Sequence, residues 1–326
     1  MRPMTDGSHV ARDYRFHAAE MSSSPSYRAW ALGIAEDPET QAVIAALPAA
    51  KQQANLVFAA ARWHGARPGS YDALRATLLG PRWPQVRATI LERRTQTNEV
   101  GRLTALVPAL GMLGPGPFAL VELGASAGLC LYPDRYDYDW GERGCLTGSG
   151  GPTLATLATG PLPVPAAHPR IAARVGVDLH PLDVSDAGDR AWLLTLVWPE
   201  HEERRTRLAA ALDLAGADRP TMIAGDMLGH LKEAVALAES CGATPVVHHS
   251  AAVAYLDGEQ RERLDQRLRE LVAAGRCHWV SLEGARVLPR VTATAPVADE
   301  HRLCLAVDGR AVAWAHGHGA DLSWFG

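Results

Sequence analysis

A carboxylate and a loop of small residues follow one short apolar run of the chain. In FALVELGASAGLCLY, which we predict as a short strand, a loop and then a helix, Glu122 is followed at every second position by Gly124, Ser126 and Gly128. Small residues at the end of a buried strand let a ligand approach the backbone closely. The dinucleotide pattern Gly-x-Gly-x-x-Gly fails here, because Ser126 and Leu129 occupy its second and third glycine positions. A carboxylate before the loop would repel a pyrophosphate, so it suits a ligand with cationic groups.

Polar side chains also end the later apolar runs. These runs are RVGVDL with Asp178, TMIAGD with Asp226, PVVHHS with Ser250 and CHWVSLE with Glu283. The carboxyl ends of parallel strands meet at one edge of a sheet, where open α/β sheets bind their ligands. We therefore expect these side chains to lie close to the small-residue loop.

Two adjacent histidines are candidates for acid–base chemistry. His248 and His249 would alternate sides of a strand, so we expect at most one of them to point into the cleft. We choose His249 as general base or substrate-orienting group, because an imidazole titrates near neutral pH. The alternative is that both histidines only bind loop backbone. A metal site would need them to converge with Glu283, His316 and His318, and we expect none, because HGHG lacks the helix-borne spacing of zinc proteases.

The stretch RRTQTNEVGR contains polar residues of low helix propensity inside an otherwise helical pattern. Thr95, Asn98, Glu99 and Arg102 recur at three and four spacings, which predicts one polar stripe on a long helix over 86–110. That stripe could face the cleft and bind substrate or cofactor. The alternative is a solvated face with an ion pair between Glu99 and Arg102.

The elements that must position these residues fall into two sets. From about residue 10 to 113 apolar residues recur at helical spacing, and Asp37 before Pro38 is one predicted helix start. After Pro115 short apolar runs alternate with amphipathic segments, which predicts a mostly parallel sheet covered by helices on both faces. The dipeptide DG near the end predicts an antiparallel hairpin. We place an all-α cap domain at 1–105 and a Rossmann-like α/β domain at 106–326.

A Gly- and Pro-rich insertion at about 133–170 interrupts the α/β pattern, and long insertions are often lids or binding loops. Within it, DRYDYDWG alternates Asp with aromatic residues, which predicts a strand over 136–140 with its rings on one face. We expect these rings to pack on the helical third. Asp134 and Arg135 are the better site candidates of this stretch.

The motif of Glu122 and its loop resembles the first motif of class I S-adenosylmethionine-dependent methyltransferases, whose cofactor carries an ammonium and a sulfonium. Those enzymes usually have glycine where Ser126 stands, and in this chain the long insertion separates Glu122 from Asp178. The resemblance implies that Asp178 accepts both ribose hydroxyls and that Asp226 lies near the adenine amino group. It implies that S-adenosylmethionine is held by Glu122, Gly124, Ser126, Gly128, Asp178 and Asp226.

A second resemblance covers nearly the whole chain. The segments RTQTNEVGR, VELGASAGL, DRYDYDWG, VGVDLHPLD, WLLTLVWPE, VVHHSAAVAYL and HGHG are together similar to an uncharacterised bacterial, mainly actinobacterial, family, domain of unknown function 2332. Because that family has no known activity, the resemblance implies a fold and no catalytic residues.

The sequence thus predicts a methyltransferase that acts on a small molecule, with catalysis mainly by positioning the acceptor in line with the methyl group. The residues expected to act on the substrate are His249, Glu283, Asn98, Glu99 and Arg102. One alternative keeps the fold but uses the His/Glu cluster for hydrolase, lyase or metal-assisted chemistry. Another alternative is a non-catalytic ligand-binding protein.

Composition narrows the partners. The formal net charge of −4 argues against nucleic acid or an anionic membrane as a partner. The first twenty residues contain no continuous apolar stretch, so we expect no signal peptide and a cytoplasmic protein. The five scattered cysteines form no Cys-x-x-Cys pair and are expected to be mostly buried thiols. We expect a monomer or a homodimer.

Overall fold

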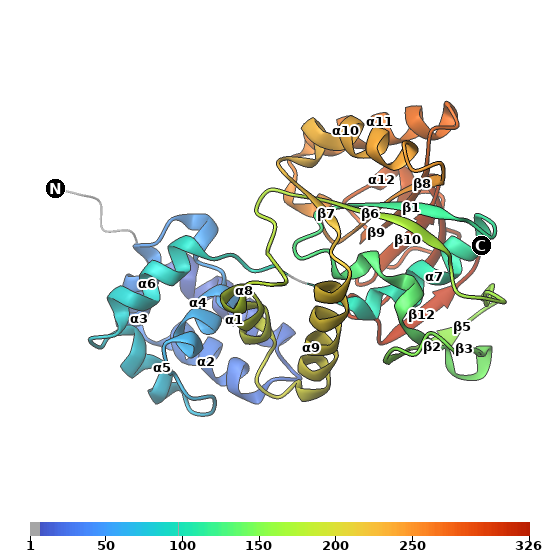
Figure 1. Cartoon of the computed structure of the whole chain (residues 1–326). Helices are drawn as coiled ribbons and strands as arrows, with labels where there is room; N and C mark the ends of the chain where they lie inside the picture. The colour runs from blue at the N-terminus through green and yellow to red at the C-terminus, as the bar shows by residue number, and fades with distance from the viewer. Residues whose placement is uncertain (1–6, 97) are drawn as a thin grey trace. The chain divides into compact units, whose positions relative to one another are not determined.

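The computed structural model describes residues 7–96 and 98–326. The chain forms two compact units, whose elements are labelled in Figure 1. The first unit comprises Met1–Thr97 and Ala187–Thr206, and the second comprises Asn98–Asp186 and Arg207–Gly326. The N-terminal segment of the first unit therefore ends at Thr97, whereas we predicted a domain boundary at residue 105. The segment Ala187–Thr206, which we assigned to the α/β domain, belongs to the first unit.

The first unit is built from helices. They are α1 (Ser8–Glu20), α2 (Pro25–Glu36), α3 (Pro38–Ala45), α4 (Ala54–Trp63), α5 (Tyr71–Leu78), α6 (Trp83–Glu92) and α8 (Ala187–Leu196), with a 3₁₀ turn η1 (Ala49–Lys51). The predicted helix start at Asp37 is confirmed, because its side chain accepts from the backbone N–H groups of Glu39 and Thr40 and Pro38 is the first helical residue.

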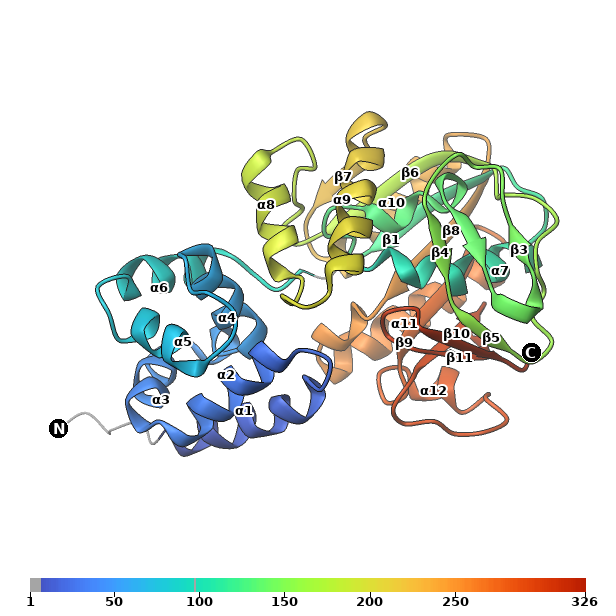
Figure 2. The ribbon, with the colours of Figure 1, turned by 90° about the horizontal axis from the view of Figure 1, so that it is seen from below.

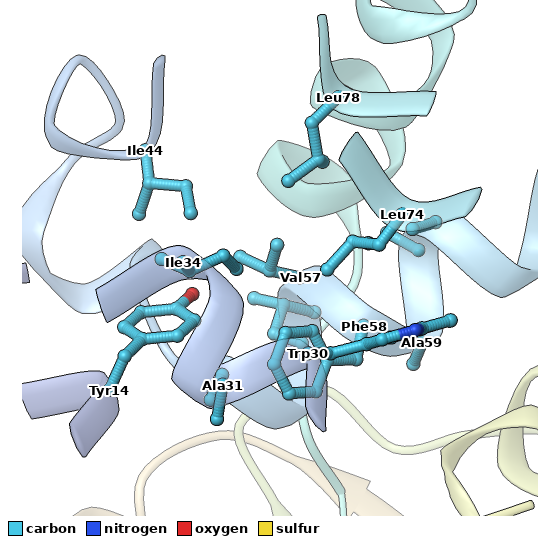
Figure 3. Close-up of a cluster of buried hydrophobic side chains, with 14 of the residues drawn as sticks. Tyr14, Trp30, Ala31, Ile34, Ile44, Val57, Phe58, Ala59, Leu74 and Leu78 are labelled. Carbon is cyan, nitrogen blue, oxygen red and sulfur yellow. The ribbon is translucent and has the colours of Figure 1, made fainter. Parts of the chain in front are cut away.

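Aromatic rings form the centre of this unit's core. Trp30 and Phe58 are fully buried and meet edge to face with ring centroids 5.5 Å apart (Figure 3). Trp192 of α8 belongs to the same core cluster, and its indole donates to the carbonyl of Arg94 at 3.0 Å. Arg62 of α4 donates to the carbonyl of Val197 at 2.7 Å, just beyond α8. These bonds fasten α8 to the N-terminal helices.

The prediction of one long helix over 86–110 is wrong. Helix α6 ends at Glu92, and the chain forms a 3₁₀ turn η2 (Val100–Arg102) and then α7 (Leu103–Met112). Thr and Asn have low helix propensity, and Glu99 ends the extended stretch by accepting from the N–H of Gly101 at 3.1 Å. Thr97 lies outside the described residues.

The second unit contains a nine-stranded sheet, and the predicted fold class is confirmed (Figures 1 and 2). Its order is β5-β12-β11-β10-β9-β8-β1-β6-β7. The strands are β1 (Phe118–Leu123), β5 (Leu157–Thr159), β6 (Ile171–Asp178), β7 (Thr221–Ala224), β8 (Thr244–Ser250), β9 (His278–Gly284), β10 (Leu303–Val307), β11 (Arg310–Ala315) and β12 (Asp321–Trp324). Strands β7, β6, β1, β8 and β9 are parallel, and β10 and β11 form the predicted antiparallel hairpin.

The strand order reverses between β1 and β8. From β1 the chain moves outward to β6 and β7, and it then returns to the other side of β1 at β8. Open α/β sheets bind ligands at such a switch point, outside the carboxyl ends of the strands. The loops that follow β1, β6, β7 and β8 are therefore where a site is expected.

The two faces of the sheet pack against different helices. Val121 and Val247 belong to an apolar cluster with residues of α10 (Met227–Glu239) and α11 (Gly258–Ala273). On the opposite face, Leu103 of α7 lines a small cavity with Leu282. The cover predicted for both faces is incomplete at the β7 edge, because Thr221 and Ala224 are exposed.

The insertion contains a small sheet of three strands, β3 (Cys145–Leu146), β2 (Asp137–Asp139) and β4 (Thr153–Ala155). The rings of Tyr136, Tyr138 and Trp140 are fully buried. Trp140 donates to the carbonyl of Thr104 at 2.8 Å, so its indole contacts α7, the last helix of the segment that we predicted as helical, and the ring of Tyr138 stacks on the indole. Within the described part of the chain, no helix is both long and apolar enough to cross a membrane.

Candidate functional site

The backbone N–H groups of the loop after β1 donate to acceptors within the protein. Gly124 and Ala125 donate to the carbonyl of Val177, Gly128 donates to the carbonyl of Ala125, Ser126 donates to Asp178 and Ala127 donates to Asn98. The helix that we predicted after this loop is wrong, because only the three-residue 3₁₀ turn η3 (Leu129–Leu131) follows. A helix N-terminus therefore does not face a ligand here.

The loop's small residues allow close contact with the loop after β8. Gly124 has φ +74°, and a Cβ on it would lie 2.4 Å from the Cβ of Ala252. Ser126 also has positive φ, at 53°, although it is not glycine. The glycine at position 124 is thus required by the packing of the two loops at the switch point.

Asn98 fixes the strained serine in place. Its side-chain amide donates to Ser126 Oγ at 2.7 Å, and its Oδ1 accepts from the N–H of Ala127 at 3.1 Å. The predicted site residue Asn98 therefore does reach the loop, although it does so from an extended segment and not from a helix stripe. Thr95, which we placed on the same stripe, instead donates to Gln53 at 2.6 Å.

Asp178 ends β6 beside this loop with its carboxylate held by two backbone donors. Oδ2 accepts from the N–H of Ser126 at 2.8 Å, and Oδ1 accepts from the N–H of His180 at 2.8 Å. An ionised carboxylate has about four acceptor positions, so each oxygen keeps capacity for a further donor. The half-buried side chain is therefore oriented by the protein and still reachable from solvent.

Asp226 lies beside Asp178 at the same edge. The N–H of Gly225 donates to the carbonyl of Asp178 at 2.8 Å, which joins the end of β7 to the end of β6. Asp226 is exposed and is the N-cap of α10, where its Oδ1 accepts from the N–H of Gly229 at 2.8 Å. Sequence reasoning missed Leu179, which is 63 % exposed next to Asp178. The sequence feature that could have identified Leu179 is an apolar residue directly after the acid that ends the strand.

Glu122 is buried beneath the loop with a carboxylate oxygen that has no partner. The side chain belongs to β1, is 5 % exposed, and its Oε2 makes no hydrogen bond to any described residue. Burial raises the pKa of Glu122 well above its usual value, the charge of Arg102 lowers it and the charge of Asp178 raises it. A buried orphan acceptor calls for a cationic or donating partner.

His248 stands beside Glu122 on the neighbouring strand, at the same register position. A cavity of about 20 Å³, room for one water, is lined by His248, Arg102, Cys130 and Ser250 among others. Nε2 of His248 is buried without a partner among the described residues, and burial, followed by the charge of His249, lowers its pKa to about 3. This imidazole is therefore neutral at physiological pH.

His249 points to the opposite face of the sheet, which confirms the predicted alternation of the two histidines. Its Nδ1 lies 2.8 Å from Oε1 of Glu283, and its Nε2 accepts from the indole of Trp279 at 3.0 Å. The indole can only donate, so Nδ1 carries the proton and donates to Glu283. His249 is 1 % exposed, and both of its ring nitrogens are engaged.

Glu283 also holds the loop after β8. Its Oε1 accepts from the N–H groups of Ala252 and Val253, both at 3.0 Å, in addition to the histidine. Ala252 is the residue that packs against Gly124. Glu283 and His249 are thus brought together as predicted, and the geometry gives them a positioning role at the switch point.

Arg102 and Glu99 are both buried but do not pair with each other. Arg102 donates to the carbonyls of Ser250 and Gly317, both at 2.9 Å. Glu99 lies 3.3 Å from Arg207, and its Oε2 lies 3.6 Å from His318. The Glu99–Arg102 ion pair, which was the alternative to a substrate-binding stripe, is not formed, and Arg102 and Glu99 instead connect η2 to the HGHG loop.

Across residues 7–96 and 98–326, no three His, Cys, Asp or Glu side chains form a group that could hold a metal ion. Three cysteines are buried and two are exposed, in keeping with mostly buried thiols; Cys130, Cys277 and Cys304 are the buried ones, and Cys145 and Cys241 the exposed ones.

Comparison with known proteins identifies a family. The model of a family described as "Uncharacterized protein conserved in bacteria (DUF2332)" matches residues 11–324. No curated protein and no solved structure matches the chain.

Proposed function

We propose that this chain, which belongs to the uncharacterised bacterial family DUF2332, binds S-adenosylmethionine and transfers its methyl group to a small molecule. The observation that carries the proposal is the carboxylate of Asp178. It stands at the carboxyl end of β6 beside the switch point, and the N–H groups of Ser126 and His180 fix its orientation. Its remaining acceptor capacity suits the two vicinal hydroxyls of a ribose.

Two neighbours of Asp178 support recognition of the base. Asp226 presents an exposed carboxylate that can accept from an exocyclic amino group, while one of its oxygens caps α10. Leu179 presents apolar surface at the same edge, on which an adenine ring can pack. The residues at the ends of β6 and β7 therefore fit the nucleoside part of the cofactor.

Glu122 supports recognition of the cationic part. Its partnerless Oε2 can accept from an ammonium, and a positive charge nearby would lower the pKa that burial has raised. The loop amides are already bonded within the protein, so the cofactor's own carboxylate must find other donors. When bound, S-adenosylmethionine supplies the electrophilic methyl group.

The residues of this chain contribute positioning. Asn98 holds the β1 loop through Ser126 and Ala127, and Glu283 holds the β8 loop through Ala252 and Val253. Keeping donor and acceptor in line is itself worth a large part of a methyl-transfer barrier. His249 has no ring nitrogen left to take a proton, so we assign it to this support. We further propose that the reaction takes place in the cytoplasm.

The test is calorimetric titration of the full chain with S-adenosylmethionine and S-adenosylhomocysteine. We expect micromolar binding that weakens at least about tenfold in Asp178→Asn, which keeps the size of the side chain, and in Asp226→Ser, which keeps an N-cap residue. Glu233→Ala, on the exposed face of α10, removes an equal charge and should leave the affinity unchanged. Absent binding to the unaltered chain, or unchanged affinity in Asp178→Asn, would refute the proposal.

A further inference from the structure

A cavity of about 370 Å³ lies in the second unit at the amino-terminal end of β6. Its walls include Ile171–Val175, Thr221, Asp134, Arg135, Asp218 and Arg219. Strand β6 has eight residues, and at ~3.3 Å per residue its two ends lie ~23 Å apart. The cavity is therefore separate from the Asp178 edge, and its volume falls in the range of ligand pockets.

One wall of the cavity is an unpaired strand edge. Strand β7 first pairs with β6 at Val175, opposite Thr221, whereas β1 pairs with β6 from Ile171 onward. In the part of the chain that the structure describes, Ile171–Arg174 thus have a strand on one side only. Such an edge presents backbone N–H and C=O groups to which an extended peptide can add as a further strand.

The guanidinium of Arg174 neutralises one acid of the cavity. It binds Asp134 through two nitrogens at 2.9 and 2.8 Å, and it lies 4.5 Å over the ring of Tyr132. Such a bidentate pair is fixed in geometry and leaves little net charge. The charge that a ligand meets is therefore set by the other ionised groups.

Those other groups carry an excess of positive charge. Arg135 lies 3.3 Å from Asp134 and 3.5 Å from Asp218, both longer than a close charge-assisted bond, and its side chain is 51 % exposed. Arg219 adds an exposed guanidinium to the same wall. Arg174 also lies 3.5 Å from Asp218, so the ionised groups that line the cavity are three guanidinium groups and two carboxylates. This net positive charge favours a ligand carboxylate.

We propose that this cavity binds a short acidic peptide in extended conformation. Its main chain pairs with Ile171–Arg174, and a carboxylate of the peptide is bound by Arg135 and Arg219. The free edge is four residues long, or ~10 Å from first to last, which matches a peptide of three or four residues. The unpaired edge supplies the affinity for the main chain, and the guanidinium groups select for the acid.

The test is titration of the full chain with N-acetyl-Val-Ala-Glu that has a free terminal carboxylate. We expect saturable binding that weakens at least fivefold in Arg135→Ala and in Arg219→Ala. Arg310→Ala removes another exposed arginine, from the β11 hairpin, and serves as the matched control. Thermal melts of each variant establish that the fold is retained.

Two further probes separate the strand edge from the charge. The same tripeptide with N-methylated amides keeps the carboxylates but cannot donate to the edge, and succinate has carboxylates without a peptide chain. We expect both to bind at least tenfold more weakly, and we expect the tripeptide to slow amide hydrogen exchange over 171–174. No saturation, equal binding of either probe, or unchanged affinity in both arginine variants would overturn the proposal.

Discussion

Replacing Glu122 by glutamine should stabilise the second unit by an amount that grows with pH. Burial raises the pKa of Glu122 well above the ordinary value of 4.5, so the folded chain holds its proton more tightly than the unfolded chain. Stability from this group is thus fully present below pH 4.5 and is lost as the pH rises toward the raised pKa. Glutamine has nearly the same shape and cannot ionise, so Glu122→Gln escapes this loss.

The magnitude follows from proton linkage. One proton of difference between the folded and unfolded states changes the free energy of unfolding by ~1.4 kcal/mol per pH unit. The advantage of Glu122→Gln should therefore increase by about 1.4 kcal/mol for each unit above pH 4.5, until the raised pKa of Glu122 is reached. Below pH 4.5 the glutamine and the protonated acid should be nearly equivalent.

Urea titrations of the full chain at several pH values between 4 and 8 measure this difference. Other ionisable groups titrate in both proteins, so their contributions cancel when the variant is compared with the unaltered chain. Glu233→Gln, at an exposed position of α10, is the matched control. A flat difference for Glu122→Gln, or a variant that loses stability as the pH rises, would show that Glu122 is not held in a desolvated site.

Two other changes test the supports of the candidate site. Glu283→Ala removes the acceptor of three hydrogen bonds, which come from the ring of His249 and two backbone N–H groups. It should lower the free energy of unfolding by about 3 kcal/mol or more in urea titrations. A loss below about 1 kcal/mol would contradict the positioning role of Glu283. Asn98→Ala leaves Ser126 and Ala127 without their partner and should cost about 1–3 kcal/mol and speed amide exchange in the loop. Unchanged exchange at Ala127 would show that Asn98 does not hold the loop.

Much of the fold was predictable because strand signals are local. Each apolar run that ends in Asp178, Asp226 or Ser250 forms a strand or leads directly out of one, and DG at 308–309 joins the two strands of the hairpin. The alternation of His248 and His249 followed from the period of a strand. The sequence did not show which of the two histidines points toward α7, because that depends on which helices cover each face of the sheet.

The errors lie where tertiary contacts override local propensity. The helical spacing of 86–110 was real, but Asn98 and Glu99 form more specific bonds in an extended chain than in a helix. The helix expected after the β1 loop is absent for a similar reason, because the insertion begins soon after it and its Trp140 is buried with the indole bonded to α7. Nothing in the sequence indicated that Ala252 would occupy the space above Gly124.

The connection from β6 to β7 departs from that of a doubly wound sheet. In a doubly wound sheet the crossover between two parallel strands normally covers them with a helix. Here α8 lies in that crossover, yet its Trp192 belongs to the core of the first unit. Thr221 and Ala224 of β7 are exposed, and β7 first pairs with β6 at Val175, so it does not reach Ile171. A short β7 thus leaves the amino-terminal part of β6 with an unpaired edge, which is where we propose that a peptide binds.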